Sequence, residues 1–469
     1  MMRARGGWCG WAGVAAGAVL LAMAGDARAQ AARELTVDEC VRLGLAGNAG
    51  LRAAGADAAA ARASYAQARA GRLPTVRAQG SYTRLSSNIP AVEFTLPGTD
   101  STIVFQGVEL NRYDAELTVE QPLFTGLQLS HRIRAAGQQA EAAAADAAQA
   151  RADVALEIRR AFWSLYRART VRASVAASIG DVEAHVRDIR NQLAEGTALT
   201  RDLLAAETRR SEVVLQRVEA DNAVRVGQLE LNRLIGLPLE TPIEPVVPAG
   251  ADSAIAEGAD SGSAGAAESG AGATGGATES LTAQALAERP QLMALAARVN
   301  ALRSQLQAVQ GSRLPQLSLV GRYSYSRPNP YFFMEPDRFH HTWELGVSAA
   351  WDLWSGGRVG AQAAEAGARL RAAEARLADT RAQVAVDVAR QRLEVTRAAE
   401  AMAAARQNVE AAGESFRVAR QQFDEGAALS SDVLAAEQAY RQAQANRAGA
   451  TADYAIARAT LLDALGRVW

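Results

Sequence analysis

The sequence contains no lysine, so all 50 of its basic residues are arginine. Together with 51 acidic residues they give a formal net charge of -1, and this balance excludes a general nucleic-acid-binding protein. Only 5% of the residues are aromatic, although 49% are hydrophobic, and much of that apolar share is alanine. This composition is typical of long, closely packed helices rather than of a core built around aromatic rings.

Cysteine is also nearly absent, with only Cys9 and Cys40 in the chain. Residues 1–29 have the pattern of a secretory signal peptide: a positively charged start, an apolar stretch over 11–24, and an A-x-A cleavage site ending at Ala29. Cleavage there would leave Cys40 as the single cysteine, which excludes an intrachain disulfide. No later apolar run is long enough for a transmembrane helix.

The rest of the sequence is a duplication. Residues 193–207 align with residues 423–437, and residues 123–126 align with residues 353–356, in both cases at an offset of 230. We expect a first structural repeat over residues 30–248 and a second over residues 281–469.

A segment rich in alanine, glycine and serine separates the two copies at residues 249–280. It carries acidic residues but no arginine, and it has too little apolar surface to offset the entropy of ordering. We expect a disordered linker. Its Gly270-x-Gly272-x-x-Gly275 pattern matches a dinucleotide-binding fingerprint, but no strand precedes it and the composition accounts for it.

Apolar residues recur every seven positions in each copy. In the second copy the repeat is Val388, Val395, Met402, Val409, Phe416 and Phe423, and only Arg172 breaks the matching repeat in the first copy. Such a heptad predicts long helices packed at shallow angles. We expect helical hairpins over residues 127–236 and 357–466, and the alternative from periodicity alone is a soluble coiled coil.

A tight turn divides each hairpin. Gly196 and Gly426 suit the left-handed residue that ends a helix. Asp202 and Asp432 then fall in the first turn of the returning helix, where a negative charge complements the helix dipole. The residues expected to cap these returning helices are Thr200 in the first copy and Ser430 or Ser431 in the second.

Alternating segments predict two strands in each copy, at about 74–85 and 114–124 and at about 315–326 and 343–354. Of the 23 aromatic residues after position 30, 14 lie within residues 74–126 and 313–356. Short alternating strands with aromatic ends are typical of a membrane β-barrel, although a soluble sheet with one buried face has the same alternation.

Four strands cannot close a barrel around a pore, and open strand edges are not tolerated in lipid. The strands of several chains must therefore associate. Two chains would supply eight strands, with an interior filled by side chains, and three would supply twelve. A homotrimer fits best if the protein is a conduit.

These features together resemble the TolC-type outer-membrane efflux protein family. The resemblance rests on the signal peptide, the duplicated helix-strand-strand-helix unit, the Leu-Pro before the first strand of each copy, and the turns Gly-x-x-x-x-x-Asp-x-Leu that begin at Gly196 and Gly426. It implies an α+β fold in which a trimeric 12-stranded outer-membrane β-barrel is continuous with a long periplasmic α-helical barrel.

The resemblance also implies a function. The chain would be the outer-membrane exit duct of a tripartite efflux pump, working passively with a periplasmic adaptor and an inner-membrane transporter, without cofactor or catalysis. A first alternative is the outer-membrane duct of a type I protein secretion system. A second alternative is a periplasmic structural coiled-coil protein, which would be released with the soluble periplasm.

Family members close the periplasmic end of the tunnel at the hairpin tips, so the resemblance implies a gate formed by Asp202, Asp432 and Phe423. Phe423 and Ala428 stand where some members carry a tyrosine and an arginine, so closure is expected to depend more on packing than on salt links. For the aspartates the alternative is a capping role alone. The tip residues implied to contact the adaptor are Gly196, Thr197, Gly426 and Ala427.

The sequence favours neither a metal site nor an enzyme active site. Five potential metal ligands lie between the strands of the second copy, namely Glu335, Asp337, His340, His341 and Glu344, and such a set is more common in a polar loop of a barrel than in a metal site. His131 and His185 lie within long helices without a nucleophile motif. We therefore expect no metal, no cofactor and no enzyme activity.

Overall fold

The structure, a computed structural model, describes residues 33–89, 92–95, 98, 102–106, 109–247, 273–332 and 335–467. The expected signal peptide and most of the expected linker lie outside these residues. The described residues fall into two compact units. The hairpin unit comprises those within Met1–Gly47, Ile158–Ala256 and Ala404–Ala452, and the sheet unit comprises those within Asn48–Glu157, Glu257–Ala403 and Asp453–Trp469.

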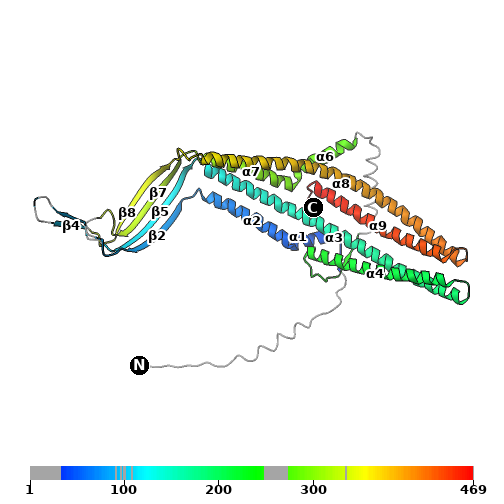
Figure 1. Ribbon diagram of the computed structural model, residues 1–469. Coiled ribbons are helices and arrows are strands. Elements are labelled where there is room, and N and C mark those ends of the chain that lie inside the picture. The colour runs from blue at the N-terminus through cyan, green and yellow to red at the C-terminus, as the bar shows by residue number, and fades with distance from the viewer. Residues whose placement is uncertain are drawn as a thin grey trace, which may run out of the picture. The chain divides into compact units, whose positions relative to one another are not determined.

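The two copies contain the same order of main elements (Figure 1). The first copy has α1 (Val37–Gly47), α2 (Ala49–Ala70), β2 (Thr75–Arg84), β5 (Asn111–Thr125), α3 (Gln128–Ala194) and α4 (Thr200–Ile235). The second copy has α6 (Ala273–Glu288), α7 (Pro290–Gly311), β7 (Gln316–Arg327), β8 (His340–Ala350), α8 (Arg358–Asp424) and α9 (Ser430–Ala464). At 67 residues each, α3 and α8 are about 100 Å long at 1.5 Å per residue.

Several element boundaries differ from those expected from the sequence, including the starts of β5 and β8, which each lie three residues earlier. Helix α6 begins at Ala273, so residues 273–280, expected in the linker, are helical. Strand β8 ends at Ala350, although its alternating pattern continues to residue 354. The reason is that Ala350 pairs with Gln316, the first residue of β7, so the ladder has no further partner residue.

Four short strands were not expected. Strands β3 (Val92–Thr95) and β4 (Thr102–Gln106) form an antiparallel pair between β2 and β5 in the sequence. Strand β1 (Arg33–Leu35) pairs in parallel with β6 (Ile243–Pro245). Strands of three to five residues are too short to show a period of two, which explains why the sequence pattern misses them.

The four long strands form one antiparallel sheet in the order β2-β5-β7-β8. Its register aligns Ala78 with Leu117, Leu117 with Tyr323, and Tyr323 with Trp343. Because side chains alternate along each strand, such rows share one face of the sheet. The apolar face carries Val76, Ala78, Gly80 and Tyr82 of β2, Tyr113, Ala115, Leu117 and Val119 of β5, Leu319, Gly321, Tyr323 and Tyr325 of β7, and Trp343, Leu345, Val347 and Ala349 of β8.

The opposite face is mostly polar, and its apolar members are Val320, Gly346, Pro122 and Ala350. It carries Arg77, Gln79, Ser81 and Thr83 of β2, Arg112, Asp114, Glu116 and Thr118 of β5, Ser318, Arg322 and Ser324 of β7, and Thr342, Glu344 and Ser348 of β8. On this face Arg322 bridges two carboxylates, with Glu116 at 2.9 Å and Glu344 on the neighbouring strand. Strands β2 and β8 are the two edges of the sheet.

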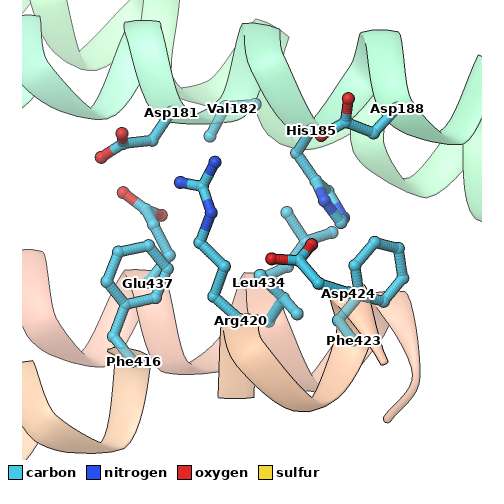
Figure 2. Close-up of a pocket in the computed structure, with 11 residues that line it drawn as sticks. Asp181, Val182, His185, Asp188, Phe416, Arg420, Phe423, Asp424, Leu434 and Glu437 are labelled. Atoms are coloured by element: carbon cyan, nitrogen blue, oxygen red, sulfur yellow. The ribbon is translucent and has the colours of Figure 1, made fainter. Parts of the chain in front are cut away.

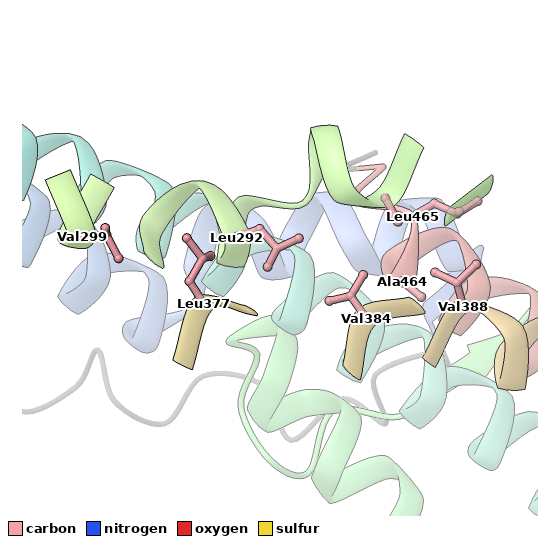
Figure 3. Packing of buried hydrophobic residues seen from close by; sticks show 8 residues of the cluster. Leu292, Val299, Leu377, Val384, Val388, Ala464 and Leu465 are labelled. Atoms are coloured by element: carbon pink, nitrogen blue, oxygen red, sulfur yellow. The ribbon is translucent and has the colours of Figure 1, made fainter. Parts of the chain in front are cut away.

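Small and branched apolar side chains from four helices, α6 to α9, form a core cluster of the sheet unit (Figure 3). Leu292 of α7 packs with Leu377 and Val384 of α8, and Leu465 lies directly after α9 in the same cluster. The amphipathic faces of these helices therefore bury one another, as the apolar heptad predicts.

The junction between β5 and α3 needs glycine. Gly126 has φ of +60°, and a Cβ built on it would lie 2.4 Å from the carbonyl oxygen of Gly311, at the end of α7. Gly356 occupies the same position in the second copy with the same φ, but a Cβ there would have no atom within 4 Å. The duplicated glycines therefore share a backbone conformation but not a packing constraint.

In the hairpin unit, Val182, Val186 and Ile189 of α3 pack with Ala206 and Val213 of α4. Arg172, the residue that breaks the heptad, is exposed, and its Nε lies 2.6 Å from an Asp221 carboxylate oxygen of α4. None of the described helices combines the length and apolar character needed to cross a membrane.

Helix α1, in the same unit, contains Cys40. This side chain is completely buried and is a free thiol. Burial raises the pKa of Cys40 to about 12. The thiol is therefore almost entirely protonated at neutral pH.

Candidate functional site at the helical hairpin tips

The two hairpin turns have matching geometry. Gly196 and Gly426 both have φ of +77°, a conformation that favours glycine. The residue after each glycine donates its backbone N–H across the turn, from Thr197 to the Gln192 carbonyl at 2.9 Å and from Ala427 to the Gln422 carbonyl at 2.7 Å. These bonds satisfy carbonyls at the helix ends, so both tips are well-defined turns.

Asp202 and Asp432 hold the start of the returning helices. A carboxylate oxygen of Asp202 accepts the backbone N–H of Leu199 at 3.3 Å, and Asp432 accepts that of Leu429 at 3.2 Å. The aspartates therefore do contribute to capping.

The capping residues differ from those expected, because Leu199 precedes the first turn of α4 and Thr200 is already helical. In the second copy, the Ser430 hydroxyl lies 2.8 Å from His185 Nε2 and is engaged there. The Ser430 hydroxyl, which the sequence pattern predicts to cap α9, is therefore hydrogen-bonded to His185.

Phe423, the third expected gate residue, packs between the two hairpins. Its ring centroid lies 5.1 Å from that of His185 on α3, and it contacts the apolar cluster of α3 and α4. Figure 2 shows His185 projecting from α3 toward Phe423 of α8, and Arg420 projecting from α8 toward α3. The cavity between them is about 20 Å³, which is room for one water molecule rather than for a substrate.

A buried carboxylate also links the two hairpins. Glu437 of α9 is 2% exposed, and it accepts hydrogen bonds from Ser178 of α3 at 2.5 Å and from Arg209 of α4 at 3.2 Å. Arg441 of α9 donates to Glu437 at 3.2 Å and also to Asp181 of α3. Polar links therefore join the two hairpins in this unit, beyond the turns.

The equivalent residue of the first copy behaves differently. Glu207 aligns with Glu437 at the offset of 230, but its side chain is 45% exposed and pairs with Arg190 of the same hairpin at 3.0 Å. The duplicated glutamates therefore have a surface role in one hairpin and a buried, bridging role in the other.

His185 makes the hairpin unit sensitive to pH. The side chain is 8% exposed, and burial lowers its pKa, with Asp188 and Asp424 acting in the opposite direction and Arg420 in the same direction. As pH falls below the ordinary value of about 6.5, the unfolded state takes up this proton more readily than the folded state. Stability is therefore full above that pH and decreases below it.

Between pH 7.5 and pH 5, we expect the melting temperature of the wild type to fall further than that of His185→Gln, by a few degrees. Circular dichroism melts at several pH values measure this difference. His131→Gln, a substitution in the sheet unit, is the control that should follow the wild-type curve. Parallel curves for the wild type and His185→Gln would contradict the assignment of this pH dependence to His185.

The five polar residues weighed as metal ligands do not converge. Glu335 lies 3.3 Å from His340 Nε2, whereas the His341 ring stacks on Tyr323 and Glu344 pairs with Arg322. Across the described part of the chain, no three histidine, cysteine, aspartate or glutamate side chains are grouped so that they could hold a metal ion.

Sequence patterns missed several residues at the tips. Leu199 and Leu429 occupy equivalent positions, and their side chains are 55% and 65% exposed. Their repetition at the offset of 230 was a usable signal. For Arg209 and Glu437 no sequence pattern shows that they meet, because their contact exists only in the folded unit.

Comparison with known proteins identifies a family for the sequence. A profile of the outer membrane efflux protein family matches residues 41–237 and 281–467, once in each copy. No curated protein matches the sequence.

Several solved structures share the fold. The outer membrane protein VceC of Vibrio cholerae aligns with a TM-score of 0.72 and 18% identity, covering 92% of this chain and 96% of that chain. The CmeC outer membrane channel of Campylobacter jejuni aligns with a TM-score of 0.73 and 15% identity, covering 92% and 85%. The open state of the Neisseria gonorrhoeae MtrE outer membrane channel aligns with a TM-score of 0.69 and 18% identity, covering 92% and 88%.

The family match spans most of both copies, and the structural likeness covers the same region. The chain is therefore a member of the outer membrane efflux protein family, and it is a transport protein and not an enzyme.

Proposed function

We propose that three copies of the chain form an outer-membrane channel that serves as the exit duct of a tripartite efflux pump. The observation that carries this proposal is the four-stranded sheet, which has one apolar face, one polar face and two open edges. Three such sheets joined edge to edge form a closed barrel of twelve strands, with the apolar face toward lipid and the polar face toward the lumen.

The apolar face has the pattern expected of a lipid contact. Trp343, Leu345 and Val347 are each more than 60% exposed, which a soluble sheet would bury. Tyr113 and Phe124 mark aromatic ends of β5 that are 11 residues apart, or about 37 Å at 3.4 Å per residue. A strand tilt of about 40° reduces this to about 29 Å, close to the height of a membrane barrel's apolar band. This face argues against a purely periplasmic coiled coil.

Helix α4 supports the association of several copies. One stripe along it exposes large apolar side chains, with Leu215 and Val218 both 61% exposed. The other members of the stripe are Leu204, Val226 and Leu229. A neighbouring copy that covered this stripe would complete a helical barrel in the periplasm, continuous with the strands through the junctions of β5 with α3 and of β8 with α8.

The hairpin tips are the proposed contact with the periplasmic adaptor. Gly196, Thr197, Gly426 and Ala427 are exposed, and Leu199 and Leu429 add an apolar side chain beside each turn. A rigid tip with an exposed leucine provides an anchor for an adaptor helix. The adaptor would in turn connect the duct to an inner-membrane transporter.

The oligomeric state tests the proposal. In mild detergent, the mature protein should have the mass of three chains by light scattering, because two open edges per sheet must be covered. A stable monomer or dimer would contradict the barrel.

We also propose that the tips restrict conduction. In a trimer, Asp202 and Asp432 would bring six carboxylates to one constriction and raise the local concentration of cations. Replacing both with alanine should reduce cation selectivity and block by multivalent cations in planar bilayers, and loss of the cap should cost about 1 kcal/mol per helix.

Glu195 and Glu425 precede the turns and add negative charge near the same constriction. Replacing both with alanine removes charge but no helix cap, so this variant is the matched control for the aspartate variant. Unchanged selectivity in the aspartate variant would leave Asp202 and Asp432 with the capping role alone.

A further inference from the structure

An aromatic cluster lies at the end of the sheet that is remote from the helices, on the apolar face. The ring centroids of Tyr82 and Tyr113 are 5.0 Å apart, those of Tyr113 and Phe339 5.7 Å, and those of Tyr325 and Phe339 5.2 Å. All four rings are between 37% and 57% exposed. In the proposed barrel this end is the one farther from the periplasm. Exposed aromatic rings at such an end lie at the level of the lipid headgroups.

Two arginines belong to the same end of the apolar face. Arg327 pairs with Tyr113 in the register, and its guanidinium carbon lies 5.3 Å from the Tyr113 ring and 5.6 Å from the Phe339 ring. Its Nε is buried and has no hydrogen-bond partner. Arg84 is next to the cluster through Asn111, whose side-chain oxygen accepts from both Arg84 and Tyr82 at 3.1 Å.

These arginines lack the carboxylate partners that Arg322 of the same sheet has. Arg322, on the polar face, bridges Glu116 and Glu344. Among the described residues, no carboxylate forms an ion pair with Arg84 or Arg327, although both are held by neutral partners. A positive charge at the edge of an apolar surface needs an anion, and the part of the chain that the structure describes pairs none with these two side chains.

We propose that Arg84 and Arg327 bind the phosphate of a lipid headgroup in the leaflet that surrounds this end of the barrel. A guanidinium can donate two parallel hydrogen bonds to phosphate oxygens, and its interaction with the aromatic rings holds it ready to do so. The exposed surface of Trp343 and Leu345 continues the apolar face toward the membrane interior, where acyl chains would lie. That surface favours a lipid over a free anion. The inference rests on the proposed barrel.

The test uses the full mature protein in neutral detergent, titrated with dioleoyl phosphatidic acid and followed by native mass spectrometry. We expect up to three bound lipids per trimer. The double variant Arg84→Gln/Arg327→Gln should need about tenfold more lipid for the same occupancy. Arg112→Gln is the matched control, because Arg112 lies at the same level of β5 but on the polar face. It should bind lipid as the wild type does.

Two further ligands test whether the site recognises the phosphate of a lipid, the acyl chains alone or free phosphate. Dioleoylglycerol, with the same chains but no phosphate, should not compete, and inorganic phosphate at the same concentration should not displace the lipid. Equal lipid binding by the double variant and Arg112→Gln would overturn the site, and displacement by inorganic phosphate would overturn its assignment to a lipid. A wild-type protein that is not trimeric would instead overturn the barrel, and a trimer that binds no lipid would overturn the site alone.

Discussion

Replacing Glu437 with glutamine should loosen the contact between the two hairpins by about 3 kcal/mol. The side chain is nearly fully buried, and its loss of charge leaves the buried Arg209 and the half-buried Arg441 without their shared partner. Removing one member of a buried ion pair costs far more than removing an exposed one, because the remaining charge stays out of water. Hydrogen exchange should show about a hundredfold lower protection in residues 178–186 and 432–441.

The duplication provides the control for this experiment. Glu207→Gln removes the equivalent carboxylate from an exposed pair with Arg190, which should cost less than about 1 kcal/mol. If both variants lost protection equally, the buried position of Glu437 would have no special energetic role. Hydrogen exchange is the suitable measurement because it reports local opening without requiring reversible unfolding of a membrane protein.

The second large effect is expected at the junction of β5 and α3. Gly126→Ala would place a methyl group 2.4 Å from the Gly311 carbonyl oxygen and 2.9 Å from Leu314 Cβ, and it would also force alanine into φ of +60°. Overpacking costs about 1–3 kcal/mol and the left-handed conformation about 1 kcal/mol more. We expect a cost of roughly 2–4 kcal/mol in each chain and a marked fall in the yield of assembled protein.

Gly356→Ala separates these two contributions. The position has the same φ, but a Cβ there meets no atom within 4 Å, so only the conformational cost of about 1 kcal/mol applies. The yield of assembled protein and its dissociation temperature should therefore stay close to wild type. Equal damage from both substitutions would mean that backbone conformation, and not the close approach to α7, makes Gly126 necessary.

The elements that the sequence predicts are those determined by local pattern. Heptads place α3 and α8, alternation places the four long strands, and Gly196 and Gly426 mark the turns within a residue or two. Each of these signals depends on residues close together in the chain. The duplication strengthened them, because each pattern occurs twice.

Features that depend on distant residues were not predictable. The end of β8 is determined by where β7 begins, and the Ser430 hydroxyl is occupied by His185, which lies 245 residues away. Likewise, the matching glutamates at 207 and 437 look equivalent in sequence, and only the fold buries one of them. For the candidate site, the pattern identifies the tips but not the contacts that join them.

The buried thiol of Cys40 has a practical consequence for spectroscopy. With a pKa of about 12, this thiol is almost never ionised at pH 7.5, and the side chain is shielded from reagents. If the signal peptide is removed with Cys9, the native chain therefore serves as its own unreactive background for maleimide or nitroxide labelling. Single cysteines introduced by Thr197→Cys or Ala427→Cys would be labelled selectively, and dipolar distances between copies would then report directly how wide the tips open.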